Sequence, residues 1–353
     1  MFPGGAKQGI SQTLKIPKYL LVAFNVVLDL LMGCSSGGAA VRDNTSSESS
    51  AIKMVHFRTL DWDMPSLRRV VVILDFVLEP QGEVVASSIT YAGFVGVLTG
   101  VRRDLGLSLN FRAVREGSGR WTADLRYYGH LVLVLLGARQ SISSILRGYL
   151  LPRDASASRG GMAMPLPSYA EIVKEFSCSD RRLLSTACYL CFSSGRETTV
   201  IEKDLMTARK RSSSEFIVVT NGEALEDAAD TAAKEKSATS PSAKKSKTTR
   251  GASPPPASAL EELIEDANER KACAEKNYRS LLRRRAKELR QIHGSGLQGQ
   301  VGSSALLSTV NDIVEVVQKY PTTNECTHFA AVLDPLEGKI AWCRYWREPI
   351  DMF

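Results

Sequence analysis

The sequence predicts an α+β protein whose strands form a sandwich of antiparallel sheets. Three observations support this fold class. Segments rich in β-branched residues follow one another through short turns, as in 51–63 and 68–102, which is typical of hairpins. Helical segments separate these runs without the regular strand–helix alternation of a doubly wound sheet. The length of 353 residues and the apolar fraction of 44% suffice for one large domain or two of ordinary size.

An apolar run, YLLVAFNVVLDLLMG, occupies residues 19–33 and is followed by Cys34. It is shorter than the roughly 20 apolar residues that span a bilayer. The core of a secretory signal is one interpretation, because lysines precede the run. The polar residues inside it favour another, a globular helix that carries Asn25, Asp29 and Cys34 along one side and ends at a site. The small polar residues at 35–50 predict a loop after it.

The middle of the chain predicts strands followed by two helices. In order, the strands lie at 51–63, 68–102 and 105–114, and the helices at 130–151 and 168–177. Gly137 is expected to interrupt the first helix. Ser168 is expected to open the second, with Glu171 three residues later completing a capping box.

The second half of the chain predicts further strands, two helices and a final hairpin. In order, these are strands at 186–205 and 212–224, helices at 258–292 and 305–320, and a hairpin at 327–346 that turns near 334–338. Residues 223–258 are rich in Ala, Ser, Lys and Pro and almost free of large apolar side chains. Such a segment cannot bury enough surface to fold alone, so we predict a disordered insertion there.

The cysteines and the charge argue against a metal centre and against nucleic-acid binding. Seven cysteines, an odd number spread over a long chain, do not form a disulfide framework. Cys188 and Cys191 form a CxxC without a second ligand pair, so we interpret them as inward thiols of a buried strand and expect no metal and no cofactor. The net charge of +7 comes largely from short basic runs without interleaved aromatic residues, which favours a solvated linker and helix face over a nucleic-acid partner.

Cys34 has three explanations: the end of a secretory signal, an ordinary buried thiol, or a nucleophile made by cutting the chain in front of it. The four histidines are scattered and form no Cys/His signature. Cleavage of the Gly33–Cys34 bond would give Cys34 a free α-amine, and the ordinary pKa of such an amine, about 7.7–8.0, suits a general base. Gly33 fits such a bond because glycine tolerates strained backbone and crowds the thiol least.

Three polar residues could serve such a centre. Arg58 and Asp61 lie three apart at the end of a strand, where an arginine would favour the thiolate and a carboxylate would hold the α-ammonium. Asn221 ends an apolar strand, where its amide could donate to an oxyanion. Each also fits an ordinary role, because Arg–x–x–Asp pairs occur on surfaces and Asn before Gly is common in turns.

Several motifs resemble the acid ceramidase and N-acylethanolamine acid amidase family. FNVVLDLLMGCSS is similar to the family's processing site, and RTLDWD to its Arg–x–x–Asp strand. SSITYAGFVGVLTGVR and LSLNFR resemble the strands that follow, and VVTN and NERKACAEKNY resemble the segments with its oxyanion asparagine and a later arginine. The match runs from about residue 9 to the carboxyl end. Its most specific parts are the block at 91–112 and the region of Cys34.

The resemblance implies an N-terminal-nucleophile hydrolase fold, in which two stacked antiparallel sheets lie between helical layers in the order αββα. It also implies self-cleavage before Cys34 and hydrolysis of the amide bond of ceramide to a fatty acid and a sphingoid base. By motif position, Arg58 and Asp61 support the thiol and the amine, Asn221 donates to the oxyanion, and Arg270 completes the polar site. Asn110 lies in a closely matching segment, LSLNFR, without an assigned role.

The resemblance also implies a division of the chain. Residues 1–33 would be the remnant of a pro-piece that is cleaved before Cys34 and stays associated, and residues 34–353 the catalytic domain with its insertion at 223–258. The family's pro-piece is much longer than this remnant, so we expect a truncated front half. Family members act on lipid amides, in lysosomes, in acidic vacuoles or outside cells, and we expect transient contact with a membrane surface.

Two alternatives stay open. The same fold could act on N-acylethanolamines, or on acyl-amide side chains such as those cut by penicillin-V and bile-salt hydrolases. The segment YAGFVGVLTG favours a long acyl chain, although it could equally be core. The second alternative is an inactive relative that no longer cleaves itself and uses its basic insertion to bind a membrane surface or an acidic partner.

Overall fold

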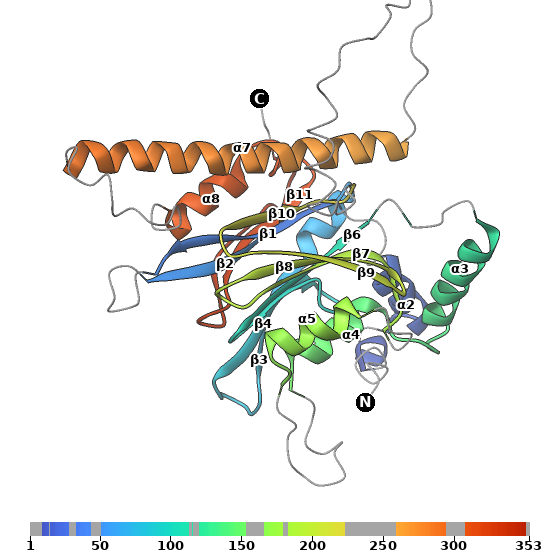
Figure 1. The fold of residues 1–353 in the computed structure, drawn as a ribbon. Coiled ribbons are helices and arrows are strands. Elements are labelled where there is room, and N and C mark those ends of the chain that lie inside the picture. Colours follow the sequence, from blue (N-terminus) through green and yellow to red (C-terminus); the bar gives the residue numbers. More distant parts are fainter. Residues whose placement is uncertain are drawn as a thin grey trace, which may run out of the picture.

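The computed structural model places most of the predicted strands and helices in one sandwich (Figure 1). The residues that the structure describes are 9–13, 15–27, 33–43, 51–112, 115, 120–152, 166–178, 183–222, 259–293 and 308–350. The predicted insertion at 223–258 lies outside them.

The first sheet holds five antiparallel strands in the order β10-β1-β2-β11-β12. Their bounds are β1 Gly33–Arg42, β2 Ile52–Asp61, β10 Phe216–Val219, β11 Thr327–Asp334 and β12 Lys339–Tyr345. Strand β1 pairs with β2 along its whole length, so that Gly33 lies opposite Asp61 and Ser36 opposite Arg58. The other edge of β1 pairs with β10, which places Ser36 opposite Val219, two residues before Asn221.

The second sheet holds seven antiparallel strands in chain order. They are β3 Val71–Val77, β4 Val84–Tyr91, β5 Thr99–Arg102, β6 Leu105–Phe111, β7 Ser185–Ser193, β8 Thr198–Leu205 and β9 Thr207–Ser213. Each strand therefore pairs with its neighbours in the sequence, as the predicted run of hairpins requires. The segment that joins β3 to β4 turns at Pro80 and Gln81, and Gln81 adopts a left-handed conformation there with φ 66°.

Helices cover the outer face of each sheet (Figure 1). Helices α7 (Ala259–His293) and α8 (Val310–Gln318) pack on the five-stranded sheet, where Tyr278 stacks on Phe216 with ring centroids 4.1 Å apart. Helices α4 (Ile142–Leu150) and α5 (Tyr169–Ser177) pack on the seven-stranded sheet, where Phe176 contacts Phe192. This gives the four layers αββα, so the predicted α+β sandwich is confirmed.

The remaining helices are α2 (Lys18–Val27) and α3 (Trp121–Leu135). Gly137 follows α3 with φ 73° and separates it from α4, as predicted for the interruption. Ser168 caps α5, and its hydroxyl and the Glu171 carboxylate form the predicted capping box. Among the described helices, none combines the length and hydrophobicity needed to cross a bilayer.

The loop predicted at 35–50 is wrong for its first part, because residues 35–42 belong to strand β1. Small residues allow this strand to lie in the crowded centre of the sandwich. A Cβ at Gly37 would collide with the carbonyl of Ile217, and a Cβ at Gly38 with the side chain of Thr198 from the other sheet. The polar, glycine-rich composition thus reflects close packing rather than exposure.

The prediction of a helix with Cys34 on one side is also wrong. Helix α2 ends at Val27, and Cys34 lies in β1, while Asp29 falls outside the described residues. Asn25 is 4% exposed, donates to the carbonyl of Gly93 at 3.1 Å and accepts from the backbone N–H of Val95 at 2.9 Å. Its place in an apolar run is therefore explained by two hydrogen bonds that fix α2 to the second sheet's β4–β5 connection.

Cys188 and Cys191 are buried in β7, as the sequence predicts. Because they lie three residues apart in a strand, their side chains face opposite sides of the sheet. Cys188 packs toward the helices with Leu190 and Phe192. Cys191 faces the first sheet with Ile217. In the part of the chain that the structure describes, no group of three His, Cys, Asp or Glu side chains could hold a metal ion.

Candidate active site

The site forms where the start of β1 meets the end of β2 between the two sheets. Side chains alternate along β1, so Cys34 and Ser36 face the second sheet, while Ala39 and Val41 face α7 and α8. Both Cys34 and Ser36 are fully buried. The thiol of Cys34 therefore lies in the interior between the two sheets, out of contact with bulk water.

Arg58 of β2 lies beside the thiol. Its Nη2 is 3.0 Å from Sγ of Cys34, and the whole side chain is buried. Burial raises the pKa of the Cys34 thiol, and the positive charge of Arg58 opposes this effect. In the uncut chain the thiol is therefore a neutral group with a guanidinium positioned to stabilise its anion.

Asn110 of β6 links Arg58 to the second sheet. Its Oδ1 accepts from Nη1 of Arg58 and, at 2.6 Å, from the hydroxyl of Ser36. Its Nδ2 donates to the carbonyls of Val219 and Thr220 at 3.2 and 3.4 Å. Asn110 is fully buried, so these contacts cross the gap between the two sheets at the thiol.

Asp61 ends β2 on the side of the site that faces α7. Its Oδ2 accepts from Nη1 of Arg270 at 2.8 Å, and its Oδ1 accepts from the hydroxyl of Thr327 at 2.7 Å. Burial raises the pKa of Asp61 to about 6, although the charge of Arg270 acts in the opposite direction. Near neutral pH the carboxylate depends on Arg270 as its counter-ion.

Arg270 extends from α7 into the same centre and is 2% exposed. Besides Asp61, it donates to Oδ1 of Asn221 at 3.1 Å, to Asp266 one helical turn away at 3.0 Å, and to Ser35 at 3.4 Å. One long side chain thus joins α7 to β1, to β2 and to the end of β10.

Asn221 follows β10 and holds the backbone nitrogen of Cys34. Its Oδ1 accepts the N–H of Cys34 at 2.7 Å, and its Nδ2 donates to the carbonyl of Phe111 at 2.8 Å. The guanidinium of Arg270 has only donors, so its contact requires the oxygen of Asn221 on that side and fixes the orientation of the amide. The nitrogen that cleavage would turn into an α-amine therefore already has a polar partner.

The Gly33–Cys34 bond lies at the start of β1, beside Asp61. Gly33 pairs with Asp61, and a Cβ at Gly33 would lie only 3.2 Å from Cβ and the carbonyl oxygen of Asp61. A larger residue would press on the Cβ and backbone of Asp61, whose carboxylate binds Arg270. The absence of a side chain at Gly33 thus has a packing explanation as well as the chemical one inferred from the sequence.

The predicted site residues converge. Cys34, Arg58, Asp61, Asn221 and Arg270 come from β1, β2, the end of β10 and α7, and form one connected set of contacts. Arg270 pairs with the carboxylates of Asp61 and Asp266, whereas the contacts of Arg58 among the described residues are Ser36, Asn110 and the thiol, so its positive charge is left for a thiolate or an oxyanion to balance. Such an arrangement can carry out nucleophilic attack on an acyl group.

Five residues whose side chains contact the predicted set have no role in the sequence-based prediction: Ser35, Ser36, Asn110, Asp266 and Thr327. A signal for Asn110 exists in LGLSLN, where Gly106, Ser108 and Asn110 alternate with leucines. This alternation indicates a polar face on a strand whose other face is core. No local pattern identifies Thr327, because its contact with Asp61 depends on the pairing of β11 with β2.

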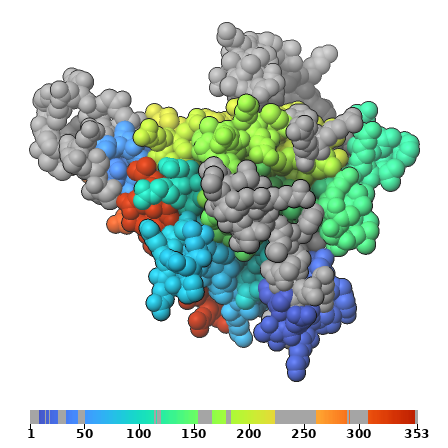
Figure 2. All heavy atoms as spheres, turned by 90° about the horizontal axis from the view of Figure 1, so that it is seen from below, coloured from blue at the N-terminus to red at the C-terminus, as the bar shows by residue number. Residues whose placement is uncertain are grey.

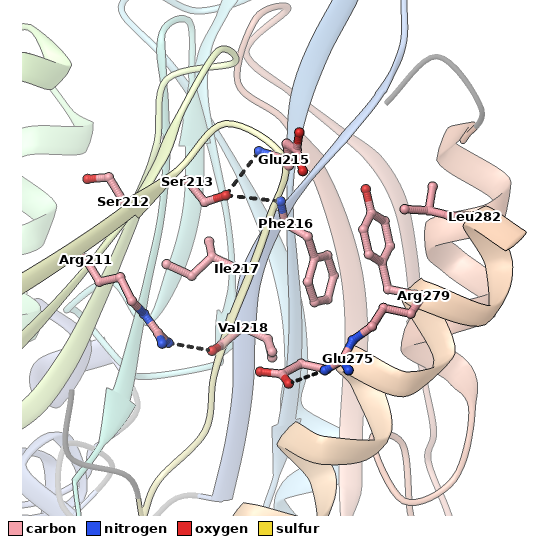
Figure 3. Close-up of a pocket in the computed structure, with 11 residues that line it drawn as sticks. Arg211, Ser212, Ser213, Glu215, Phe216, Ile217, Val218, Glu275, Arg279 and Leu282 are labelled. Atoms are coloured by element: carbon pink, nitrogen blue, oxygen red, sulfur yellow. Dashed lines mark hydrogen bonds and ion pairs between the residues drawn. The ribbon is translucent and has the colours of Figure 1, made fainter. Parts of the chain in front are cut away.

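A surface groove of about 360 Å³ lies elsewhere, between the segment 211–218, which leads from β9 into β10, and α7 (Figure 3). Its wall on α7 includes Glu275 and Arg279, which pair at 2.9 Å, and its other wall includes Arg211, which donates to the carbonyl of Val218 at 3.5 Å. None of the five predicted site residues lines this groove.

No family sequence model and no curated protein sequence matches the chain. A solved structure of a Caenorhabditis elegans N-acylethanolamine-hydrolyzing acid amidase ortholog is similar to it, with a TM-score of 0.51 and 19% sequence identity. The similarity covers 89% of this chain and 100% of that chain. It confirms the fold that the sequence resemblance implies.

Proposed function

We propose that the chain is a self-processing amidase in which Cys34 is the nucleophile and, after cleavage, the new amino terminus. The observation that carries this proposal is that both reactive ends of Cys34 have polar partners in one buried site. Asn221 accepts from its nitrogen at 2.7 Å, and Arg58 contacts its sulfur at 3.0 Å. An ordinary buried thiol needs no guanidinium beside its sulfur, and a backbone N–H within a sheet is usually paired with a neighbouring strand rather than with a side-chain amide.

In the proposed self-cleavage, the sulfur of Cys34 attacks the carbonyl carbon of Gly33. The C–N bond to Cys34 breaks as the C–S bond forms, and the thiol proton passes to the released amine. Water then opens the thioester, which leaves a carboxylate on Gly33 and restores the thiol. Arg58 stabilises the sulfur anion, and Asp61 lies opposite Gly33 to hold the new ammonium group.

In the proposed turnover, the α-amine takes the thiol proton and the sulfur attacks the carbonyl of a fatty amide. Asn221 and a backbone N–H stabilise the oxyanion, and the amine then protonates the departing amino group. Water hydrolyses the acyl thioester and releases the fatty acid. Arg270 supports both stages, because it contacts Asp61 and Asn221 together.

The proposed substrate is ceramide, in line with the motif resemblance. N-acylethanolamines form a second candidate class, favoured by the fold similarity to the nematode protein whose name states that activity. Both are amides of long-chain fatty acids, so the same acyl-transfer chemistry would serve them. The amine half of the substrate distinguishes the two candidates.

The proposal includes a pro-piece that stays bound after cleavage and transient contact with a lipid surface. Asn25 supports the first part, because its hydrogen bonds to Gly93 and Val95 do not depend on the Gly33–Cys34 bond. For the second, α3 exposes a stripe of apolar side chains at helical spacing, and α2 and α3 both reach the surface in Figure 2. The stripe consists of Trp121, Leu125, Tyr128, Val132 and Leu135 of α3, together with Leu136, the residue that follows the helix.

Release of fatty acid from defined amides tests the proposed function. Wild type, Cys34→Ala and Cys191→Ala are incubated with ceramide, an N-acylethanolamine or a penicillin-V-type amide in identical mixed micelles at pH 5 and pH 7. Wild type is expected to release fatty acid from ceramide fastest, and Cys34→Ala to be at least about a thousandfold slower. Cys191→Ala is the matched control, because Cys191 is also buried between the sheets but contacts His56.

Each other outcome has a defined meaning. Faster hydrolysis of the N-acylethanolamine would select the second candidate class. No hydrolysis of any amide by folded wild type would contradict the enzyme and favour the binding-protein alternative. Full activity of Cys34→Ala would remove Cys34 from the reaction.

A further inference from the structure

Asn110 makes contacts that neither its strand nor the hydrophobic core requires. A side-chain amide offers two acceptor positions and two donors, and Asn110 uses all four. The acceptors bind Arg58 and Ser36 on the first sheet, and the donors bind the carbonyls of Val219 and Thr220 just before Asn221. The side chain therefore joins the strand of Arg58 to the strand of the thiol and to the segment that leads to Asn221.

The orientation of Arg58 depends on this contact. Nη1 of Arg58 binds Ser36 at 2.8 Å as well as Asn110, and Ser36 in turn donates to Asn110, so the three groups close a triangle. Among the described residues, Nε of Arg58 has no hydrogen-bond partner. Because the guanidinium is a rigid planar fork, fixing Nη1 also fixes the direction of Nη2. Nη2 then points at Sγ of Cys34.

We infer that Asn110 is a positioning residue that aims the Arg58 guanidinium at the Cys34 thiol, and so sets how readily the thiol ionises. The inference deepens the proposed function and rests on it for its catalytic meaning. Asn110 does not itself touch the sulfur in the contacts described. Its effect on the thiol passes through Arg58. A change in thiol ionisation can therefore be measured separately from a change in the stability of the fold.

The test measures the pH dependence of Cys34 alkylation by iodoacetamide in the folded chain, followed by peptide mass spectrometry. An arginine beside a thiol lowers its pKa by about 1–3 units, so misdirecting Arg58 in Asn110→Ala is expected to move the rising limb of the profile up by about one pH unit. At a pH on that limb, alkylation slows about tenfold. A role in folding alone would lower the melting temperature without moving the limb.

Two comparisons make the test specific. Arg58→Lys replaces the planar guanidinium with a point charge that Asn110 cannot aim. Adding Asn110→Ala to Arg58→Lys should therefore slow alkylation by less than about twofold, because the effects of coupled residues do not add. Ser108→Ala is the matched control: Ser108 is buried on the same face of β6, but its hydroxyl lies 3.0 Å from Nε2 of His56. It should leave the limb unmoved and its effect should add to that of Arg58→Lys.

Ser36→Ala replaces Asn110→Ala in the test if the latter variant does not fold. It removes the hydroxyl that binds both Arg58 and Asn110, so it should also move the rising limb of the alkylation profile to higher pH. An unmoved limb in a folded Asn110→Ala chain, or additive effects with Arg58→Lys, would overturn the inference. Amide hydrolysis, assayed in parallel, separates the two proposals: a moved limb in a chain without amidase activity would refute only the proposed function.

Discussion

Arg270→Met is expected to destabilise the fold by about 3–5 kcal/mol at pH 7.5, because it leaves the buried Asp61 carboxylate without its counter-ion. The loss should be much smaller at pH 5. The folded-state pKa of Asp61 is raised to about 6, so at pH 5 the carboxyl is largely protonated and needs no cation. Because the pKa of Asp61 is higher in the folded state than in the unfolded state, its protonation stabilises the fold. This stabilisation is fully present below the unfolded pKa and is lost as the pH rises through the folded pKa.

Urea unfolding of wild type and Arg270→Met at both pH values measures this difference. Adding Asp61→Asn to Arg270→Met should recover stability at pH 7.5, since the double variant buries no unpaired charge. Arg102→Met is the matched control, because Arg102 is a buried arginine that donates to the backbone carbonyls of Tyr149, Arg103 and Pro167. Equal losses at pH 5 and pH 7.5 in Arg270→Met would contradict the ion-pair explanation.

Asn221→Ala is expected to lower kcat for amide hydrolysis by about 10²–10³-fold, the usual cost of removing one oxyanion donor. The carbonyl of Asn221 accepts from the nitrogen of Cys34, while its NH₂ group donates to the carbonyl oxygen of Phe111. One side chain can therefore serve both the amine, through its oxygen, and an oxyanion, through its nitrogen.

Asn221→Asp distinguishes these two contacts. It keeps an oxygen for the Cys34 nitrogen and for Arg270 but has no N–H to donate, so we expect turnover as low as in Asn221→Ala. Wild-type turnover in Asn221→Asp would show that the donor is not used. Thr220→Val is the neighbouring control, because the hydroxyl of Thr220 donates to Ala267 of α7. Kinetics of the cleaved proteins, with folding checked by circular dichroism, provide the comparison.

Local spacing and motif resemblance suffice to predict some residues of the site from the sequence. Arg58 and Asp61 end one strand, and Asn221 follows another, so their positions along the chain already indicate a strand-end site. Arg270 can be identified only by resemblance, because the contact with Asp61 joins a helix to a strand 209 positions away in the sequence.

The parts that the sequence does not predict depend on packing between distant strands. The composition of β1 indicates a loop because its residues are small and polar, yet Gly37 and Gly38 are small because other strands lie against them. Asn110 has no role in the sequence-based prediction because its partners belong to segments outside its own sheet. A single sequence shows that such a residue is polar, but not which groups surround it.

The most direct test of the central claim is the intact mass of the purified chain. Wild type, Cys34→Ala and Cys191→Ala are incubated at pH 5 and pH 7.5 and analysed by mass spectrometry with sequencing of any new amino terminus. We predict that wild type and Cys191→Ala yield a fragment that begins at Cys34 and that Cys34→Ala stays uncut. A folded wild-type chain that remains intact at both pH values would contradict self-processing and the nucleophile assigned here.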